Sequence, residues 1–459
     1  MKFKDGLVAA RSHIVFLLAV AVAFGLMYRL EKWDIQKEIE REIREGLTID
    51  LSEDIPEVAP RSLTEEEREW ARIAWTYFET NYQPETGLVN SVADYPATTM
   101  WDTASYLMAL ISARRLEMID RATFDRRLDK ALETLERLPL FEGKLPNKSY
   151  NTVTGEMTDY ANAPTEKGIG WSAIDMGRLI APLNIVVWNY PAHAERVTRT
   201  IRRWDLGAMI QNGVLFGASI GEENQTLYLQ EGRMGYEEYA AKAFYLMGMD
   251  VYRALRYMDF LKFIDIYGVR VPYDLRDPAT YGAQNYVLSE PYILDGIEFG
   301  WDEASREFAW RVYQAQERRY HNTGTLTAVS EDHLDQAPYF VYNTVFSDGT
   351  PWNCVDSQGN PAPRFRTLST KAAFGWYALY RNGYTRTLVD RVRELHDPEK
   401  GWFSGLYETP EAPNRAITCN TNAIVLESLC FIRLGRHVTV YDSEAASPFP
   451  PDPIQENAP

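Results

Sequence analysis

The stretch LQEGRMGYEEYAA, residues 229–241, contains three glutamates, two tyrosines and two glycines. Glu237 and Glu238 fall in the first turn of an expected helix, where the helix dipole favours acidic side chains, and Glu238 can also pair with Lys242 one turn later. Glu231 lies upstream of that helix, in a backbone that glycine residues allow to bend sharply. Helix formation therefore explains two of the glutamates, and Glu231 is the first candidate for a functional carboxylate.

Each of the other long loops also brings at least one carboxylate and one aromatic ring. Carboxyl groups that flank a sugar, together with rings that stack on its neighbours, are typical of glycoside hydrolases. Two simpler interpretations stay open, because Asp102 can serve as a helix N-cap and the loop carboxylates can belong to solvated turns. The residues that we expect to contact a substrate are Trp101, Asp102, Tyr160, Trp171, Arg233, Tyr236, Glu238, Tyr292, Asp335, Trp352 and Trp402.

Other kinds of chemistry find little support in the sequence. Asp332 and His333 are adjacent, but the chain has only six histidines and no HxxxH or paired-cysteine motif near them, so we predict no metal site. GxSxG, P-loop, Rossmann glycine and HExxH motifs are absent, so we expect no cofactor. The formal net charge of -17 argues against nucleic acid and anionic lipid as partners, and it favours a neutral substrate.

A repeated helical unit would position these loops. In each unit a charged amphipathic segment is followed by a glycine with short apolar residues, a polar loop and an apolar segment rich in alanine and aromatic residues. Neighbouring units in such a repeat bury each other's apolar faces. The pattern therefore predicts an all-α fold, an (α/α)6 toroid of six helical hairpins, with an open solenoid as the alternative. The charged segments are 64–79, 125–138, 192–204, 258–267, 303–320 and 385–395, and the apolar segments are 101–118, 171–188, 236–252, 290–301, 369–384 and 420–434.

The N-terminus predicts export. Three basic residues precede an uncharged run from Ser12 to Tyr28, which we interpret as a single transmembrane helix, with a cleaved signal peptide as the alternative. Either interpretation places the rest of the chain outside the cytoplasm; with an anchor, the protein is single-pass in the inner membrane with its C-terminal domain in the periplasm. The expected divisions are a cytoplasmic tip and membrane anchor at 1–30, a stalk or linker at 31–62, the toroid at 63–440 and a disordered Pro-rich tail at 441–459.

Three cysteines, Cys354, Cys419 and Cys430, are too few for a disulfide framework. In an exported chain, Cys354 and Cys419 can form one bridge. Three buried free thiols are the other interpretation.

The segments QEGRMGYEEYAA, WDTASYLMAL and NTNAIVLESL resemble a family of bacterial envelope proteins catalogued as a domain of unknown function, DUF3131. The resemblance covers about residues 63 to 436 and implies a glucoamylase-like toroid, similar to families that cleave or rearrange β-1,2-glucans. In those glucanases a general-acid glutamate lies in the third hairpin loop, and this role would fall here on Glu231. Their base or nucleophile matches no single residue of this chain, and Asp159 and Asp332 are candidates on position alone.

The sequence thus favours an envelope-anchored glycoside hydrolase or transglycosidase that acts on a neutral bacterial glucan or exopolysaccharide. The alternative is a non-catalytic protein that binds a polysaccharide and works beside its synthase, because binding needs the aromatic rings without an acid pair. A polysaccharide lyase is the third hypothesis, since helical toroids also host that chemistry. In every case the expected partner is a poly- or oligosaccharide.

Overall fold

The computed structural model describes residues 49–276 and 285–440, which from Ser52 onward belong to one compact unit. The predicted anchor at 1–30, most of the predicted stalk and the tail at 441–459 lie outside the described residues. Within the described ranges, no helix is both long enough and apolar enough to cross a membrane.

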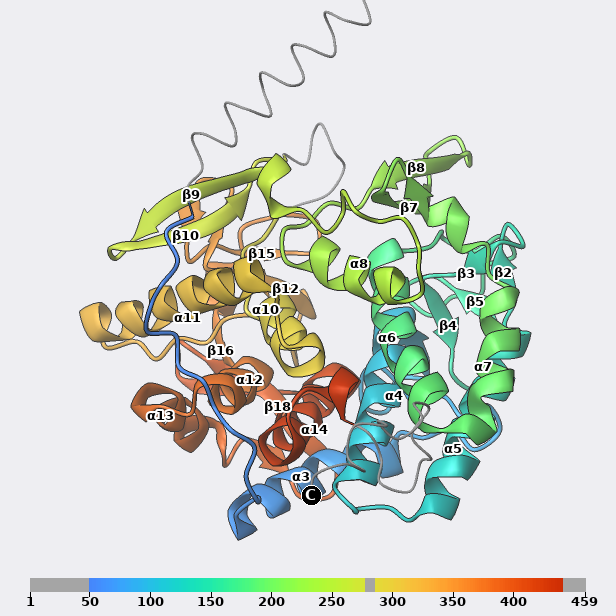
Figure 1. Cartoon of the computed structure of the whole chain (residues 1–459), viewed down its shortest axis with the longest axis horizontal. Coiled ribbons are helices and arrows are strands. Elements are labelled where there is room, and N and C mark those ends of the chain that lie inside the picture. Colours follow the sequence, from blue (N-terminus) through green and yellow to red (C-terminus); the bar gives the residue numbers. More distant parts are fainter. Residues whose placement is uncertain (1–48, 277–284, 441–459) are drawn as a thin grey trace, which may run out of the picture. The chain divides into compact units, whose positions relative to one another are not determined.

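Six helices of the described chain form a closed inner ring (Figure 1). Each helix packs against the next one along the chain, and the last packs against the first, so the open-solenoid alternative is excluded. The contact between the second and third helices is very close, because a Cβ on Gly177 would lie 2.5 Å from the Cβ of Ala240. The six helices are α4 (Met100–Arg115), α6 (Ala173–Asn189), α8 (Tyr236–Leu246), α10 (Glu290–Leu294), α12 (Thr370–Tyr380) and α14 (Cys419–Leu434).

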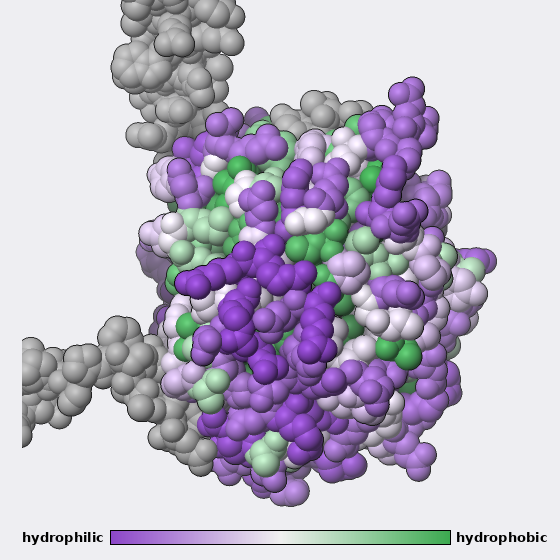
Figure 2. Space-filling model, turned by 90° about the vertical axis from the view of Figure 1, so that its right-hand side faces the viewer, coloured by the Kyte–Doolittle hydropathy of each residue, from purple (hydrophilic) through white to green (hydrophobic). Residues whose placement is uncertain are grey.

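Five helices of the described chain form the outer layer. Several begin at polar caps: Thr64 forms a capping box with Glu67, and Asp120 and Asp302 accept backbone N–H groups of their first turns. Each buries one apolar stripe, and the face over the second and third of them is mainly hydrophilic (Figure 2). The five are α3 (Glu65–Thr80), α5 (Arg121–Arg137), α7 (Pro191–Arg202), α11 (Glu303–Thr323) and α13 (Gly383–Val392).

The outer helix predicted at 258–267, the fourth along the chain, is absent. An antiparallel hairpin takes its place beside α11 (Figure 1). Its strands are β9 (Leu261–Ile266) and β10 (Val269–Asp274), joined by Tyr267 and Gly268 at φ 54° and 78°. Two central residues with positive φ make a tight turn that suits twisted strands. The helix prediction was wrong because this segment is rich in isoleucine and aromatic residues, and it pairs across the turn with β10, in which Val269, Val271 and Tyr273 recur at every second position.

The loops that lead into the inner helices also contain short antiparallel strands, so the fold is mostly helical and not all-α. Three-stranded sheets have the orders β1-β4-β5, β6-β7-β8 and β11-β12-β15, and β18 pairs with β16, β17 and β19. Two segments of other geometry matter for the site: a π-helical turn, η3 (Asp295–Phe299), extends α10, and a 3-10 turn, η2 (Tyr257–Asp259), precedes β9. The strands are β1 (Ala97–Thr99), β2 (Leu140–Phe141), β3 (Leu145–Pro146), β4 (Ser149–Asn151), β5 (Met157–Thr158), β6 (Ile210–Gln211), β7 (Val214–Ile220), β8 (Thr226–Gln230), β11 (Glu331–His333), β12 (Phe340–Asn343), β13 (Phe346–Ser347), β14 (Thr350–Pro351), β15 (Cys354–Asp356), β16 (Thr367–Ser369), β17 (His396–Asp397), β18 (Gly401–Tyr407) and β19 (Ala412–Ile417).

Residues 52–61, predicted as part of a linker, form an extended strap on the toroid. Ser52 donates two hydrogen bonds to the Glu307 carboxylate on α11, from its backbone N at 2.8 Å and from its hydroxyl at 3.0 Å. At the other end, the Arg61 backbone N donates to the Ile432 carbonyl of α14 at 2.8 Å. The strap therefore joins the outer layer to the last inner helix.

Cys354, Cys419 and Cys430 are buried free thiols. The bridge between Cys354 and Cys419 that the sequence left open is not formed in this structure.

Candidate active site

The first turns of the inner helices meet at one rim of the ring. Tyr236 at the start of α8 packs edge-on against Trp101 at the start of α4, with ring centroids 5.5 Å apart. Asn420 at the start of α14 donates to Glu290 at the start of α10 over 2.8 Å. Helix N-termini carry partial positive charge, and this rim is where acidic side chains gather.

Two carboxylates share one hydroxyl group at this rim. The Ser172 hydroxyl, at the N-cap of α6, lies 3.1 Å from Asp175 Oδ1 and 3.0 Å from Glu231 Oε2. Glu231 Oε2 also accepts the Ile174 backbone N–H at 3.1 Å. Burial, and then the negative charge of Glu231, raise the pKa of the Asp175 carboxyl to about 7. Asp175 is therefore the carboxyl group of this pair whose proton is held up to near neutral pH.

The position of Glu231 depends on its neighbours in the β7–β8 hairpin. Its backbone N donates to the Leu215 carbonyl of β7 at 2.9 Å. Its carboxylate occupies the space that a side chain at position 217 would need, since a Cβ on Gly217 would lie 2.1 Å from Oε1. A glycine on the facing strand thus leaves room for the carboxylate.

Tyr160 lies near the carboxyl pair of Asp175 and Glu231. Its side chain is 67% exposed. Burial of its hydroxyl, and then the negative charges of Asp175 and Glu231, raise the pKa of Tyr160. The hydroxyl is therefore close enough to feel both carboxyl groups, while much of the side chain is exposed.

A second carboxyl group lies across Arg233. The guanidinium carbon of Arg233 is 5.5 Å from the centre of the Tyr342 ring. Beyond it, the Glu331 carboxyl on β11 faces the Tyr236 hydroxyl. Burial, and then the charge of Glu290, raise the pKa of Glu331 to about 7. Glu331 as a residue remains partly exposed, while its Oε2 is buried and has no hydrogen-bond partner among the described residues.

A buried ion pair supports this side of the rim. Lys371, at the start of α12, contacts the Glu290 carboxylate, and both side chains are almost fully buried. Burial lowers the pKa of Lys371, but Glu290 first, then Asp332 and Glu331, raise it above its usual value, so its ammonium group stays charged. The Lys371 ammonium group thus interacts with the carboxyl groups of Glu290, Asp332 and Glu331.

A second ionic cluster lies under the floor of the rim. Arg178 of α6 has no exposed surface and binds Glu298 of η3 at 2.6 Å and Glu427 of α14 at 3.1 Å. Its guanidinium carbon lies 4.9 Å from the centre of the Trp101 ring. The cluster ties three elements together directly below the site.

The chain matches the family model "Protein of unknown function (DUF3131)" over residues 69–435. It belongs to this family. A search of curated proteins gave no match.

Solved structures with the same fold as this DUF3131 chain include carbohydrate-active proteins. A candidate glucoamylase from Bacteroides caccae has 13% identity and a TM-score of 0.59, over 81% of this chain and 93% of the other. An endo-β-1,2-glucanase from Chitinophaga pinensis, in complex with sophorotriose and glucose, has 13% identity and a TM-score of 0.59, over 82% and 94%. An endo-β-1,2-glucanase from Talaromyces funiculosus, with sophorose, has 11% identity and a TM-score of 0.57, over 82% and 85%. At such low sequence identity, these similarities show that the fold is shared and do not assign an activity.

Several residues singled out in the sequence do lie at the rim of the DUF3131 toroid. Glu231, Tyr160, Arg233 and Tyr236 surround the two carboxyl clusters, and Trp101 lies between Tyr236 and Arg178. Their roles toward a substrate stay predictions.

Asp102 lies in the first turn of α4 and is tied to the cap of that helix. Its backbone N donates to the Thr99 hydroxyl at 3.0 Å, and that hydroxyl lies 2.8 Å from Asp102 Oδ2. Burial raises the pKa of Asp102. The helix cap therefore accounts for these contacts, although Thr99 and not Asp102 is the N-cap residue, and a substrate contact stays a prediction.

The two candidates for the second catalytic carboxyl group are occupied elsewhere. Asp159 Oδ1 accepts the backbone N–H groups of Ala161 and Ala163 within its own turn. Asp332 is 2% exposed and accepts the hydroxyls of Thr367 at 3.1 Å and Ser369 at 3.0 Å. Asp332 is therefore closed off, whereas Asp159 is partly exposed with one oxygen engaged in its own turn, and both assignments stay predictions.

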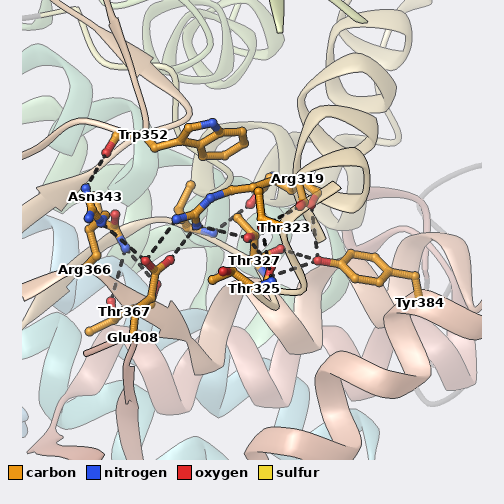
Figure 3. A network of polar contacts seen from close by, with 12 residues as sticks. Arg319, Thr323, Thr325, Thr327, Asn343, Trp352, Arg366, Thr367, Tyr384 and Glu408 are labelled. Carbon is orange, nitrogen blue, oxygen red and sulfur yellow. Dashed lines mark hydrogen bonds and ion pairs between the residues drawn. The ribbon is translucent and has the colours of Figure 1, made fainter. Parts of the chain in front are cut away.

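Asp332 is linked through Thr367 to a polar network that joins the fifth loop to α11 and to Glu408. Thr367 follows Arg366, which pairs with Glu408 at 3.3 Å, and Glu408 also binds Arg319 of α11 (Figure 3). The Arg319 guanidinium lies against the Trp352 ring, with its carbon 4.9 Å from the ring centre (Figure 3). The Tyr267 ring stacks on Trp352, with the ring centroids 6.3 Å apart. Trp352, one of the predicted substrate contacts, therefore packs against both Arg319 and the tip of the β9–β10 hairpin.

The remaining predicted contacts are buried or bonded within the protein, and their contacts with a substrate stay predictions that the geometry does not favour. Trp171 and Trp402 have no exposed surface, and their indole N–H groups donate to the carbonyls of Phe216 and Trp70. Tyr292 and Glu238 are each 2% exposed, and Glu238 closes a capping box on the backbone N of Gly235. Asp335 is exposed but accepts the Tyr407 hydroxyl at 2.7 Å and the Arg415 backbone N–H. These side chains build the scaffold of the loops.

Four residues at the centre of the site were not among the predicted site residues: Asp175, Glu290, Glu331 and Lys371. Asp175 follows Ser172 by three positions, which is the usual pattern of a helix cap. Glu290 and Lys371 begin apolar helices and look like ordinary first-turn residues. Only Glu331 carried a signal, as a loop carboxylate beside the candidate Asp332.

Proposed function

We propose that the protein is a glycoside hydrolase or transglycosidase that acts on a neutral glucan. The observation that carries the proposal is the carboxyl pair of Asp175 and Glu231, which share the Ser172 hydroxyl beneath the exposed Tyr160 ring. Burial and the charge of Glu231 let Asp175 retain a proton up to near neutral pH, and a glycosidic oxygen needs such a proton in order to leave.

The proposed reaction uses carboxyl groups from both sides of Arg233. Glu231, re-protonated through its pair with Asp175, donates a proton to the glycosidic oxygen as the bond from that oxygen to the anomeric carbon breaks. Glu331 takes a proton from the water or sugar hydroxyl whose oxygen bonds to the anomeric carbon. Each proton and each bond is then accounted for, and the tyrosine rings hold the adjoining sugars.

The charge of the site supports a neutral substrate. The rim gathers the acidic side chains of both carboxyl clusters around the cations Arg233 and Lys371, and the whole chain carries a net charge of -17. An anionic sugar would be repelled. A linear β-1,2-glucan is the first substrate to test, because structures with this fold are named as β-1,2-glucanases. The proposal places the enzyme on the outer side of the inner membrane, held by the predicted N-terminal anchor.

The first test replaces Glu231 by Gln in the full-length protein and measures the release of reducing ends from linear β-1,2-glucan. Loss of a general acid lowers kcat by about 10²- to 10⁴-fold, and we expect a change of this size with little effect on KM. Glu222→Gln, an equal change on the exposed β7–β8 turn, serves as the control and retains wild-type activity. Equal rates for Glu231→Gln and the wild type would disprove the assignment.

Non-catalytic binding is the second candidate, favoured by the rings of Tyr160 and Tyr339, which are 67% and 65% exposed. Such rings stack on sugars without any acid. For a binding protein, retention on a glucan gel is unchanged by Glu231→Gln, is lost in Tyr160→Ala, and is never accompanied by released sugar.

A further inference from the structure

The hairpin that replaces the outer helix ends in a buried ion pair. Asp274 closes β10, and the Arg276 side chain returns to it, with Nε 3.0 Å from each carboxylate oxygen. Both side chains are nearly inaccessible, at 2% exposure for Arg276 and 1% for Asp274. The guanidinium carbon also lies 4.3 Å from the centre of the Phe260 ring, which leads into β9. Arg276 is therefore held in place by its own hairpin.

The free end of this guanidinium group reaches the segment that carries Glu231. Nη1 donates to Gln230 Oε1 at 3.2 Å and to Glu237 Oε2 at 2.6 Å. Gln230 Nε2 in turn donates to Glu237 Oε1 at 2.9 Å. One arginine thus joins the last residue of β8 to the first turn of α8.

Asp274 fixes the same segment from its other side. Its Oδ2 accepts the Met234 backbone N–H at 3.1 Å. Between the two attachments, Gly232 lies directly on the arginine, since a Cβ there would be 1.7 Å from Arg276 Nη1. Glu231 and Arg233 lie between the fixed points at Gln230 and Met234, so their backbone follows this clamp of Arg276 and Asp274.

We propose that Arg276 and Asp274 are positioning residues for Glu231 and Arg233, and that the β9–β10 hairpin supplies them in place of an outer helix. An outer helix would pack on the inner ring through apolar contacts. Strand β10 instead ends at Asp274, and Asp274 together with Arg276, two residues further on, contacts the segment that carries Glu231. The consequence for catalysis rests on the proposed function, whereas the clamp itself can be tested without a substrate.

Two substitutions test the clamp while keeping the protein folded. Arg276→Lys retains the positive charge beside Asp274 and Glu237, but an ammonium group cannot span the three partners that the planar guanidinium contacts. Gln230→Ala removes the link beside Glu231 without unpairing any charge. The matched controls are Arg270→Lys, at an exposed position of β10, and Gln225→Ala, at the exposed β7–β8 turn.

The first measurement is hydrogen exchange at the amides of residues 231–235. We expect exchange to accelerate about tenfold or more in both clamp variants, with α14 and both controls unchanged, because local opening exposes only this segment. Unchanged exchange at 231–235 in Arg276→Lys would overturn the proposal.

The second measurement is steady-state kinetics on β-1,2-glucan. Displacement of a catalytic group by about an ångström costs on the order of 10²-fold, so we expect kcat to fall about 10- to 100-fold with KM changed less than about threefold. Faster exchange with wild-type kcat would overturn the positioning role. If the wild-type protein itself releases no sugar, the proposed function fails, and the exchange result alone decides whether the clamp exists.

Discussion

The Glu231 carboxylate lies where the side chain of residue 217 would be, and residue 217 is a glycine. Gly217 on β7 lies directly under the carboxylate, and a side chain at this position would compete with it for the same volume. A methyl group there would displace the carboxylate from Ser172 and from the start of α6. The same position therefore offers a way to move the proposed acid without altering its chemistry.

We predict that Gly217→Ala lowers kcat by about 10²-fold while the thermal unfolding temperature changes little, because the carboxylate moves but remains at the surface of the site. Reducing-end release and thermal unfolding measure the two effects. Gly207→Ala, at an exposed position with room for a Cβ, is the control. Wild-type kcat in Gly217→Ala would show that the exact place of Glu231 does not matter.

Asp332 provides a test that depends on pH. Burial raises the pKa of its carboxyl to about 7, from 3.8 in an unfolded chain. The folded state thus binds the proton more tightly, so this group's contribution to stability is complete below about pH 4, falls as the pH rises to 7, and stays low above 7.

We therefore predict that Asp332→Asn raises the free energy of unfolding at pH 8 relative to the wild type, by on the order of 1–3 kcal/mol, and has little effect at pH 4. The amide still hydrogen-bonds the Thr367 and Ser369 hydroxyls, which can accept as well as donate. Denaturant unfolding at the two pH values measures the change. The same variant keeps its activity if Asp332 is structural, and it loses activity at every pH if the sequence-based assignment as a catalytic residue is correct.

The elements differ in how strongly the sequence specifies them. Five outer helices were predicted because each combines many charged residues with one apolar stripe, as in α5, where the buried Phe124 and Leu128 lie among charged neighbours. The prediction for residues 258–267 was wrong because this ten-residue segment has only a weak helical stripe, and it pairs with the alternating strand β10 that follows it. Glycine before short apolar residues marked turns correctly, and several of these turns start strands, as Gly143 does before Leu145 of β3.

The site was harder to predict than the fold, for a physical reason. Bent backbone around Glu231 is a local property that glycines reveal in the sequence. The pairing of Asp175 with Glu231, and of Glu290 with Lys371, joins residues from distant segments of the chain. No local pattern distinguishes such partners from helix caps or core charges, so the closed ring had to be known before they could be named.

Close packing of α6 on α8 gives a prediction for the inner ring. Gly177→Ala would place a Cβ 2.5 Å from that of Ala240 and 2.7 Å from its Cα. We expect a loss of about 1–3 kcal/mol in the free energy of unfolding, because the backbones must separate. Gly383→Ala at the start of α13, where a Cβ meets nothing within 4 Å, is the control and leaves stability unchanged or slightly higher. Equal stability of both variants would contradict the close contact.

At the scale of the whole toroid, Arg61 connects the strap to two layers. Its guanidinium binds the fully buried Glu67 carboxylate of α3, which also accepts the Tyr377 hydroxyl of α12. Burial alone would raise the pKa of Glu67, but hydrogen bonds from Arg61, the Thr64 backbone and Tyr377 hold it at about 2. This contribution to stability is present above about pH 4.5 and is lost as the pH falls toward 2.

We predict that Arg61→Gln lowers the free energy of unfolding at pH 7 by about 1–3 kcal/mol, because a buried carboxylate loses its partner. The difference from the wild type shrinks as the pH falls below about 4. Arg68→Gln, which breaks an exposed pair with Glu65 on the same helix, is the matched control and costs less than about 0.5 kcal/mol. Thermal unfolding across this pH range measures both, and an equal loss in the two variants would rule out a special role for Arg61.

The strap, residues 52–61, connects the toroid to the part of the chain in which the membrane anchor is predicted. A pull on the chain before Ser52 acts first on two hydrogen bonds to α11, and further along on the bond between Arg61 and α14. These attachments lie on the outer layer and at the seam where the ring closes. For a protein held by the predicted N-terminal anchor, a pull on the chain would therefore act first on the outer layer and on the seam of the ring, and not on the carboxyl groups at the rim.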